Sequence, residues 1–291
     1  MKKLCKTLLL TVLFANCLLF STEYSFDEAL CKYNDQDCRK PKAEADGRIQ
    51  TLNQKGATSP VDDEATKQFI DNETEKKVLE IGAAYGKVMI KKLLKFSSVE
   101  YHINDLCEDH LWIAANDLSS SGVDKGAIKN VKFLPFDITT KIKINYKYEA
   151  ILIARVLHFF SPEQLDSAIA NIYNLLNDKG KIYVVAITPY VKRYKSFIPE
   201  YERRKLNNEE FPGYVKSLRD WINKDGITQE QLAAVSPDPF MFLGEPILKK
   251  LFEKHKFNII QCQTADLGYK SDAWSYDGRE NVILIAEKIS K

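Results

Sequence analysis

Short apolar runs alternate with amphipathic stretches through the middle of this chain of 291 residues. Apolar runs bounded by turn residues predict buried strands, and apolar positions three and four apart predict helices that pack on a sheet. Strands alternating with helices favour a parallel sheet with helices on both faces. We expect strands at 77–81, 99–104, 131–135, 150–154 and 181–187, and helices at 62–72, 87–96, 108–118 and 162–176.

Two local signals set boundaries within this alternation. Ser161 precedes a proline and an apolar-periodic run, which is typical of a helix N-cap followed by proline in the first turn. The tetrapeptide Asn177-Asp178-Lys179-Gly180 predicts a turn before the strand at 181–187.

The alternation stops at residues 189–246, where six prolines are scattered among aromatic and charged residues. We interpret this segment as a mainly helical insertion that lies over the ligand edge of the sheet. A helix at 245–256 and two strands at 257–265 and 281–288 follow it. The complete prediction is a mostly parallel sheet of seven strands, with the insertion before the last strand pair.

The N-terminus differs from the rest of the chain. Lysines in the first six residues precede a mostly apolar run at 8–20, which is short for a bilayer span and typical of a signal peptide. Cleavage is expected after Cys17 or Ser21. An uncleaved anchor and a buried helix are the alternatives. Residues 22–60 are polar and predict an irregular extension with one short helix.

Composition narrows the function classes. With 42 basic and 40 acidic residues the net charge is +2, which argues against a general nucleic-acid binder. The hydrophobic content of 45% is enough for a packed core, so wholesale disorder is excluded. Cys31 and Cys38 either form a small disulfide loop in an exported protein or are two free thiols.

The most informative segment is Val78-Leu79-Glu80-Ile81-Gly82-Ala83-Ala84-Tyr85-Gly86. It predicts a buried strand, a glycine turn and the start of a helix, which is a common site for a nucleotide-like cofactor. Glycine allows positive φ and close approach of a ligand to the backbone. A nicotinamide-binding turn would have the spacing G-x-G-x-x-G, whereas this turn has E-x-G-x-x-x-G.

That spacing resembles the first motif of the class I S-adenosylmethionine-dependent methyltransferases, and further landmarks follow in the family's order. The resemblance covers residues 62–188 well and the final strand pair loosely, and it implies a methyltransferase domain over 61–291. It implies cofactor contacts from Glu80, Gly82, Ala83, Gly86, Asp105, Asp137, Ile138, Ala154 and Arg155.

The resemblance also assigns roles to some of these residues. Asp105, at the end of the second strand, would accept the ribose hydroxyls, or it caps the next helix. Asp137 would accept from the adenine amino group and the Ile138 N–H would meet the ring, or Asp137 only forms a turn. Ala154 and Arg155 would lie beside the methionine end of the cofactor, or the Arg155 side chain is simply solvated. Lys179 stands where the family usually has glycine.

Methyl transfer from a sulfonium depends chiefly on positioning and desolvation of the acceptor. His158, after the fourth strand, is the candidate base, although its apolar neighbours are also typical of a packed histidine. The four histidines have no metal-like spacing, so we expect no metal.

The acceptor class is weakly specified. The fourth strand lacks the signature of amino-directed nucleic-acid and glutamine methyltransferases, so a small molecule or a protein side chain is the favoured acceptor. An RNA acceptor and a non-catalytic binding protein of the same fold remain alternatives. We expect an exported protein with no stable membrane span after cleavage, or else an anchored protein with a cytosolic domain.

Overall fold

The computed structural model describes residues 22–222 and 238–290. Its main sheet has the order β1-β6-β5-β4-β7-β8-β12-β11. The five strands from β6 to β8 are parallel. Strand β12 is antiparallel to β8, and β11 is antiparallel to β12, so β11 again has the direction of the five parallel strands. The strands are β1 (Tyr24–Ser25), β4 (Lys77–Ile81), β5 (Glu100–Asn104), β6 (Val131–Leu134), β7 (Tyr148–Ala154), β8 (Leu176–Ile187), β11 (Phe257–Ala265) and β12 (Asn281–Lys288).

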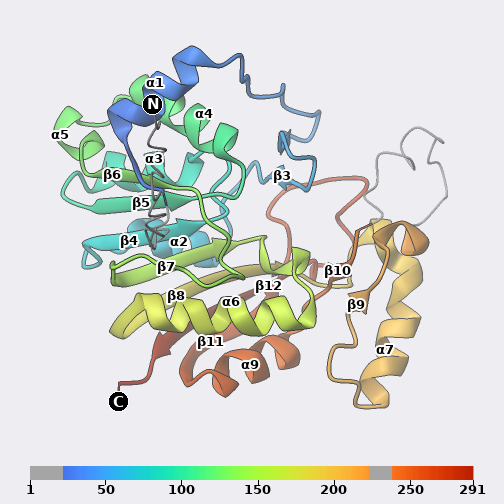
Figure 1. Cartoon of the computed structure of the whole chain (residues 1–291). Coiled ribbons are helices and arrows are strands. Elements are labelled where there is room, and N and C mark those ends of the chain that lie inside the picture. Colours follow the sequence, from blue (N-terminus) through green and yellow to red (C-terminus); the bar gives the residue numbers. More distant parts are fainter. Residues whose placement is uncertain (1–21, 223–237, 291) are drawn as a thin grey trace, which may run out of the picture.

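Helices cover both faces of this sheet (Figure 1). In β4, Val78 faces one apolar cluster, whereas Leu79 and Ile81 face the other, because successive strand residues point to opposite faces. Burial on both faces explains why the strands are apolar throughout. Helices α2 (Glu64–Asp71), α3 (Lys87–Lys95) and α4 (Glu108–Ser119) cover the first face with the one-turn α5 (Lys125–Ile128) nearby, and α6 (Pro162–Leu175) and α9 (Glu245–Lys254) cover the second.

The N-terminal extension is more ordered than its composition predicted. Ser25 caps helix α1 (Phe26–Asp35) in a reciprocal capping box, and α1 packs against α4. The ring of Tyr24 meets Trp112 edge-on at 4.8 Å between ring centroids. Strand β1 pairs with β6, so the main sheet has eight strands where seven were predicted. This added strand covers an edge that would otherwise leave backbone groups unpaired.

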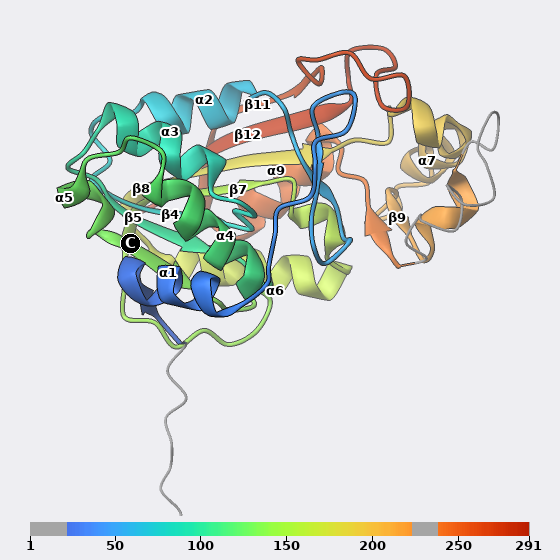
Figure 2. The same cartoon turned by 90° about the horizontal axis from the view of Figure 1, so that it is seen from above.

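Residues 44–60, which we call the strap, continue from the extension across the carboxyl edge of the parallel strands. A short hairpin of β2 (Ile49–Gln50) and β3 (Ala57–Thr58) forms its middle. Figure 2 shows this segment in blue between the sheet and the part of the insertion that carries helix α7 (Ile198–Leu206). The strap therefore lies against the glycine turn that follows β4 and against α4, which follows β5.

The insertion is only partly helical in its described residues, against a mainly helical prediction. It has its own apolar cluster, in which the rings of Tyr194 and Phe197 each contact Phe242. Residues 223–237 lie outside the described part of the chain. The elements are the 3-10 helices η2 (Lys192–Phe197) and η3 (Leu218–Trp221), helix α7 (Ile198–Leu206) and the paired strands β9 (Tyr214–Val215) and β10 (Phe240–Met241).

Strand β8 begins at Leu176, five residues earlier than predicted. Tyr148 pairs with Leu176, but Ala150 pairs with Lys181, so the expected turn is accommodated as a bulge between these two pairs. Within the bulge Lys179 has a φ of 62°.

Cys31 is exposed and Cys38 is buried, and neither forms a disulfide in the described structure. The apolar run at 8–20 lies outside the described residues. Within 22–222 and 238–290, no helix has the length and hydropathy needed to cross a membrane.

Candidate functional site

The glycine turn after β4 requires glycine at both ends. Gly82 has a φ of 69° and Gly86 a φ of 68°, in the left-handed region that side chains disfavour. A Cβ at Gly82 would lie 2.3 Å from Cγ2 of Val156, and one at Gly86 would lie 2.9 Å from Cβ of Ala114. Steric contact and backbone conformation therefore both select glycine. Ala83 donates its N–H to the Asn104 carbonyl at 2.9 Å.

Glu80 lies on the strand just before this turn and is buried, with 5% of its surface exposed. Burial raises the pKa of its carboxyl to about 8, although the Tyr101 hydroxyl donates a hydrogen bond of 2.7 Å to Oε2. Glu80 and Tyr101 are on the same face of neighbouring strands. At neutral pH the Glu80 carboxyl is therefore mostly protonated, on the face of the sheet that α2, α3 and α4 cover.

Asp105 follows β5 and is buried, and its carboxylate already accepts three hydrogen bonds. Oδ2 accepts from the Ala84 N–H at 2.9 Å, and Oδ1 accepts from the Cys107 N–H at 2.9 Å and from the His110 ring at 3.0 Å. A carboxylate offers about four acceptor positions, so about one remains for a ligand. The same bonds tie Asp105 to the glycine turn and to α4.

Asp137 follows β6 and shapes its own turn. Its Oδ1 accepts from the N–H and the hydroxyl of Thr139, at 2.8 Å and 2.7 Å. The side-chain amide of Asn104 donates to the carbonyls of Leu134 and Phe136, which holds this loop against β5. Ile138 is buried. Turn formation by Asp137 is thus observed, and its contact with adenine stays a prediction.

Ala154 ends β7, and the residue after it has an uncommon conformation. Arg155 has a φ of 59°, and its N–H donates to the Val185 carbonyl at 2.7 Å. Its Nη1 pairs with Oδ2 of Asp63, the N-cap of α2, at 3.1 Å. Its Nη2 is buried with no hydrogen-bond partner among the described residues. The guanidinium is therefore held on one side and retains a donor for a ligand.

His158 is buried in the short 3-10 helix η1 (Leu157–Phe159). Its ring stacks on Phe240 at 4.7 Å and meets Phe159 at 4.2 Å between ring centroids. Burial, with the nearby charge of Arg155, lowers the pKa of His158 to about 3. Its Nδ1 has no partner in the described part of the protein. The imidazole is neutral at physiological pH and is a weak base in this environment.

The four expected contact points follow the carboxyl ends of four adjacent parallel strands. Gly82, Asp105, Asp137 and Arg155 come after β4, β5, β6 and β7, which are neighbours in the order β6-β5-β4-β7. Carboxyl ends of adjacent parallel strands form one edge, where α/β proteins bind ligands. The topology therefore brings the predicted residues to one edge, although their contacts with a cofactor stay predictions.

Other residues of this site were missed from the sequence. Tyr101 could have been found from strand register, because it pairs with Val78 and so lies on the same sheet face as Glu80. Leu106 is an exposed apolar side chain (68%) next to Asp105. Asp63 caps α2 and His110 lies in α4, and neither had a motif that marked it as part of this site. The sequence pattern did not predict the position of the strap, because the strap contacts residues that are distant in sequence.

The strap is joined to the surrounding walls by several contacts. Oη of Tyr85, in the glycine turn, donates to the Gln50 carbonyl at 2.7 Å, and the Leu52 N–H donates to Nε2 of His110 at 3.0 Å. Further along, Lys55 pairs with Asp238 of the insertion at 3.2 Å. The strap thus connects the glycine turn, α4 and the insertion.

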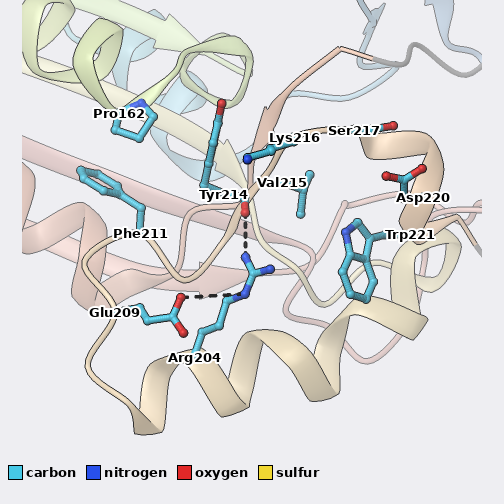
Figure 3. A pocket seen from close by; sticks show the side chains of 10 residues that line it. All are labelled: Pro162, Arg204, Glu209, Phe211, Tyr214, Val215, Lys216, Ser217, Asp220 and Trp221. Atoms are coloured by element: carbon cyan, nitrogen blue, oxygen red, sulfur yellow. Dashed lines mark hydrogen bonds and ion pairs between the residues drawn. The ribbon is translucent and has the colours of Figure 1, made fainter.

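An open hollow lies elsewhere, between the start of α6 and the insertion (Figure 3). The Arg204 guanidinium at its wall donates to the Tyr214 carbonyl at 2.7 Å and pairs with Glu200 at 2.6 Å, so its charge is satisfied within the insertion. The hollow is not part of the glycine-turn site. Its lining residues are Pro162, Arg204, Glu209, Phe211, Tyr214, Val215, Lys216, Ser217, Asp220 and Trp221.

No group of three or more His, Cys, Asp or Glu side chains suited to a metal ion occurs within residues 22–222 and 238–290.

Comparison with known proteins gives one curated relative and many structural neighbours. No family model matches the chain. An uncharacterized methyltransferase of Staphylococcus carnosus (strain TM300) is 25% identical over 169 residues, which are 54% of this chain and 73% of that protein.

Two solved structures represent the neighbours. An S-adenosylmethionine-dependent methyltransferase from Methanosarcina mazei aligns with a TM-score of 0.56 and 15% identity, covering 79% of this chain and 100% of the other. The glycopeptide N-methyltransferase MtfA in complex with S-adenosyl-L-methionine aligns with a TM-score of 0.51 and 11% identity, covering 80% and 97%. At these identities the likeness shows the shared fold.

Proposed function

We propose that this chain, which belongs by fold and motif to the class I S-adenosylmethionine-dependent methyltransferases, transfers the methyl group of S-adenosylmethionine to a small molecule or a protein side chain. The observation that carries the proposal is the geometry of Gly82. Its positive φ and its close approach to Val156 bring bare backbone to the edge where Asp105 and Arg155 also end.

The residues present fit this cofactor. Asp105 retains about one acceptor position for a ribose hydroxyl, and the exposed Leu106 beside it offers an apolar surface to an adenine ring. The buried Nη2 of Arg155, which has no partner among the described residues, suits the methionine carboxylate. When bound, the cofactor supplies an activated methyl group on a sulfonium.

The protein's part in the reaction is to position the acceptor and exclude water. His158 lies two residues after Val156, which contacts Gly82, and its unpartnered Nδ1 is suited to hold a polar group of the acceptor. Because its pKa is about 3 in this environment, we assign it positioning in preference to proton abstraction at neutral pH.

Cofactor binding is tested by isothermal titration with S-adenosylhomocysteine. We expect Gly82→Ala to weaken binding by about tenfold or more, since a Cβ there meets Val156 at 2.3 Å. Gly122→Ala is the matched control, because Gly122 has a φ of 80° but no atom within 4 Å of a built Cβ. Adding Val156→Ala to Gly82→Ala should restore part of the affinity. Lack of binding by the unaltered protein would favour a non-catalytic fold relative.

The acceptor class is tested by incubating the protein with radiolabelled S-adenosylmethionine and a cell lysate. The lysate is then separated into protein, RNA and small-molecule fractions. We expect label in the protein or small-molecule fraction, in keeping with MtfA, a structural neighbour described as a glycopeptide N-methyltransferase. Label confined to RNA would make the RNA alternative correct.

We also propose that the N-terminal segment directs export of the protein. The exported protein would then act inside another cell, which supplies S-adenosylmethionine. The basic head and short apolar run support this. Mass spectrometry of the mature N-terminus is the test. Cleavage after residue 17 or 21 is expected, and retention of Met1 would favour the anchored alternative.

A further inference from the structure

The inner side of the strap makes two polar contacts with walls of the cofactor site. Tyr85 binds the Gln50 carbonyl, and His110 accepts the Leu52 N–H at 3.0 Å. The two rings themselves meet edge-on at 5.3 Å between centroids. One contact arises from the glycine turn and the other from α4, so the position of the strap is set by the walls of the cofactor site.

The hydrogen bonds of His110 define its protonation. Because Nε2 accepts from the Leu52 N–H, the ring proton is on Nδ1, which then donates to Oδ1 of Asp105 at 3.0 Å. The ring is only 1% exposed, so water does not compete for either nitrogen. Both bonds exist together only in this neutral tautomer.

We propose that His110 is a positioning residue that couples the strap to the ribose-binding carboxylate of Asp105. The connected groups are the Leu52 N–H, the imidazole, the Asp105 carboxylate and the Ala84 N–H. When the strap leaves its place, Nε2 loses its donor and the ring keeps only the Nδ1–H bond to Asp105. The ring is then oriented from one side, so the Nδ1–H bond and the orientation of the carboxylate toward the ribose are less defined.

The coupling is reciprocal. A ligand that binds better when Asp105 is held also favours the closed strap, by the same factor. The tip of the strap is the part suited to such a shift, because β2 and β3 have two residues each and Asn53, Gln54 and Lys55 between them are exposed. This inference rests on the proposed cofactor site.

Two substitutions of His110 separate the two bonds. His110→Asn places an amide N–H near the position of Nδ1 and keeps the donor to Asp105, but it loses the acceptor for Leu52. His110→Gln places an acceptor near the position of Nε2 for Leu52, but it loses the donor to Asp105. Tyr85→Phe is the control, because it removes a strap contact, to the Gln50 carbonyl, that does not pass through His110. Circular dichroism and the melting temperature confirm that each variant is folded.

The measurement is hydrogen exchange of the Leu52 amide with and without S-adenosylhomocysteine. Without ligand, we expect exchange to be about fivefold faster in His110→Asn, the loss of one hydrogen bond, and near that of the unaltered protein in His110→Gln. With ligand, exchange should slow in the unaltered protein and in Tyr85→Phe. The slowing should be absent in both His110 variants at saturating ligand.

Slowing that persists in both His110 variants would overturn the coupling, as would equal exchange of Leu52 in His110→Asn and the unaltered protein without ligand. Failure of S-adenosylhomocysteine to bind the unaltered protein is a different result. It would contradict the proposed cofactor, while the ligand-free comparison would still test the contact between His110 and the strap.

Discussion

Several single residues of this protein adopt backbone conformations that their side chains disfavour. Lys179, Ala84 and Arg155 all have positive φ, at 62°, 46° and 59°. Ala84 and Arg155 lie at the sheet edge where we propose that the cofactor binds, and strain of this kind is common at functional sites. Lys179 is exposed in the bulge before the main part of β8 and has no such role.

Replacing Lys179 by glycine should therefore stabilise the protein. A left-handed residue with a Cβ costs about 1–2 kcal/mol, and the greater unfolded-state entropy of glycine offsets about 0.4–1 kcal/mol of that gain. We expect the free energy of unfolding of Lys179→Gly to rise by about 0.5–1 kcal/mol in urea denaturation. Lys179→Ala, which keeps a Cβ, should show no such rise, and an equal rise in both variants would contradict this explanation.

Among the elements, α6 has the most completely defined N-terminus. The Ser161 hydroxyl accepts from the Gln164 N–H, and the Gln164 side chain accepts from the Ser161 N–H. Pro162 follows at the first helical position. The helix buries Leu165, Ile169 and Ile172 against the second face of the sheet. Loss of the cap would fray the end of the helix that directly follows η1 and His158 in the chain.

Ser161→Ala should lower the free energy of unfolding by about 1 kcal/mol, the usual worth of an N-cap side chain. Ser161→Asp keeps an acceptor for the Gln164 N–H and should be close to the unaltered protein. Thermal or urea denaturation of the three proteins measures the difference. Equal destabilisation by alanine and aspartate would show that the capping bond is unimportant here.

On the scale of the whole molecule, the first face of the sheet buries two carboxyl groups. Burial raises the pKa of Glu75 to about 7 and of Glu80 to about 8, against an unfolded value near 4.5. Between these values the two folded carboxyls bind more protons than they do in the unfolded chain. Their contribution to the free energy of unfolding should therefore fall as the pH rises from about 5 to about 8. The buried His158, whose pKa is lowered from 6.5 to about 3, has the opposite effect below about pH 6.5, so the fall is clearest above that pH.

Glu80→Gln tests this dependence, because its amide oxygen still accepts from Tyr101. One group accounts for a slope of about 1.4 kcal/mol per pH unit at most, and we expect the variant to lose a measurable part of the slope in urea denaturation at pH 5–8. Glu73→Gln, on the surface, is the control. A slope unchanged by Glu80→Gln would mean that Glu80 is ionised in the folded protein.

Local periodicity predicted the central elements well. Strands β4, β11 and β12 have the expected bounds, and α6 begins after the expected cap. These elements are determined by apolar period and capping residues, which are properties of adjacent positions. The bulge in β8, the strands β9 and β10 and the eighth strand were not predicted, because each depends on pairing with a distant segment.

By itself, the sequence determined the alternation of strands and helices, the glycine turn at 82–86 and the acidic residue after the second strand of that alternation. Tertiary structure decided that a polar extension lies across this turn, that His110 bonds both Asp105 and Leu52, and that His158 is buried among aromatic rings. The physical reason is range. Turn conformation and periodicity act within a few residues, whereas burial, pKa and hydrogen-bond partners depend on segments that meet only after the chain has folded.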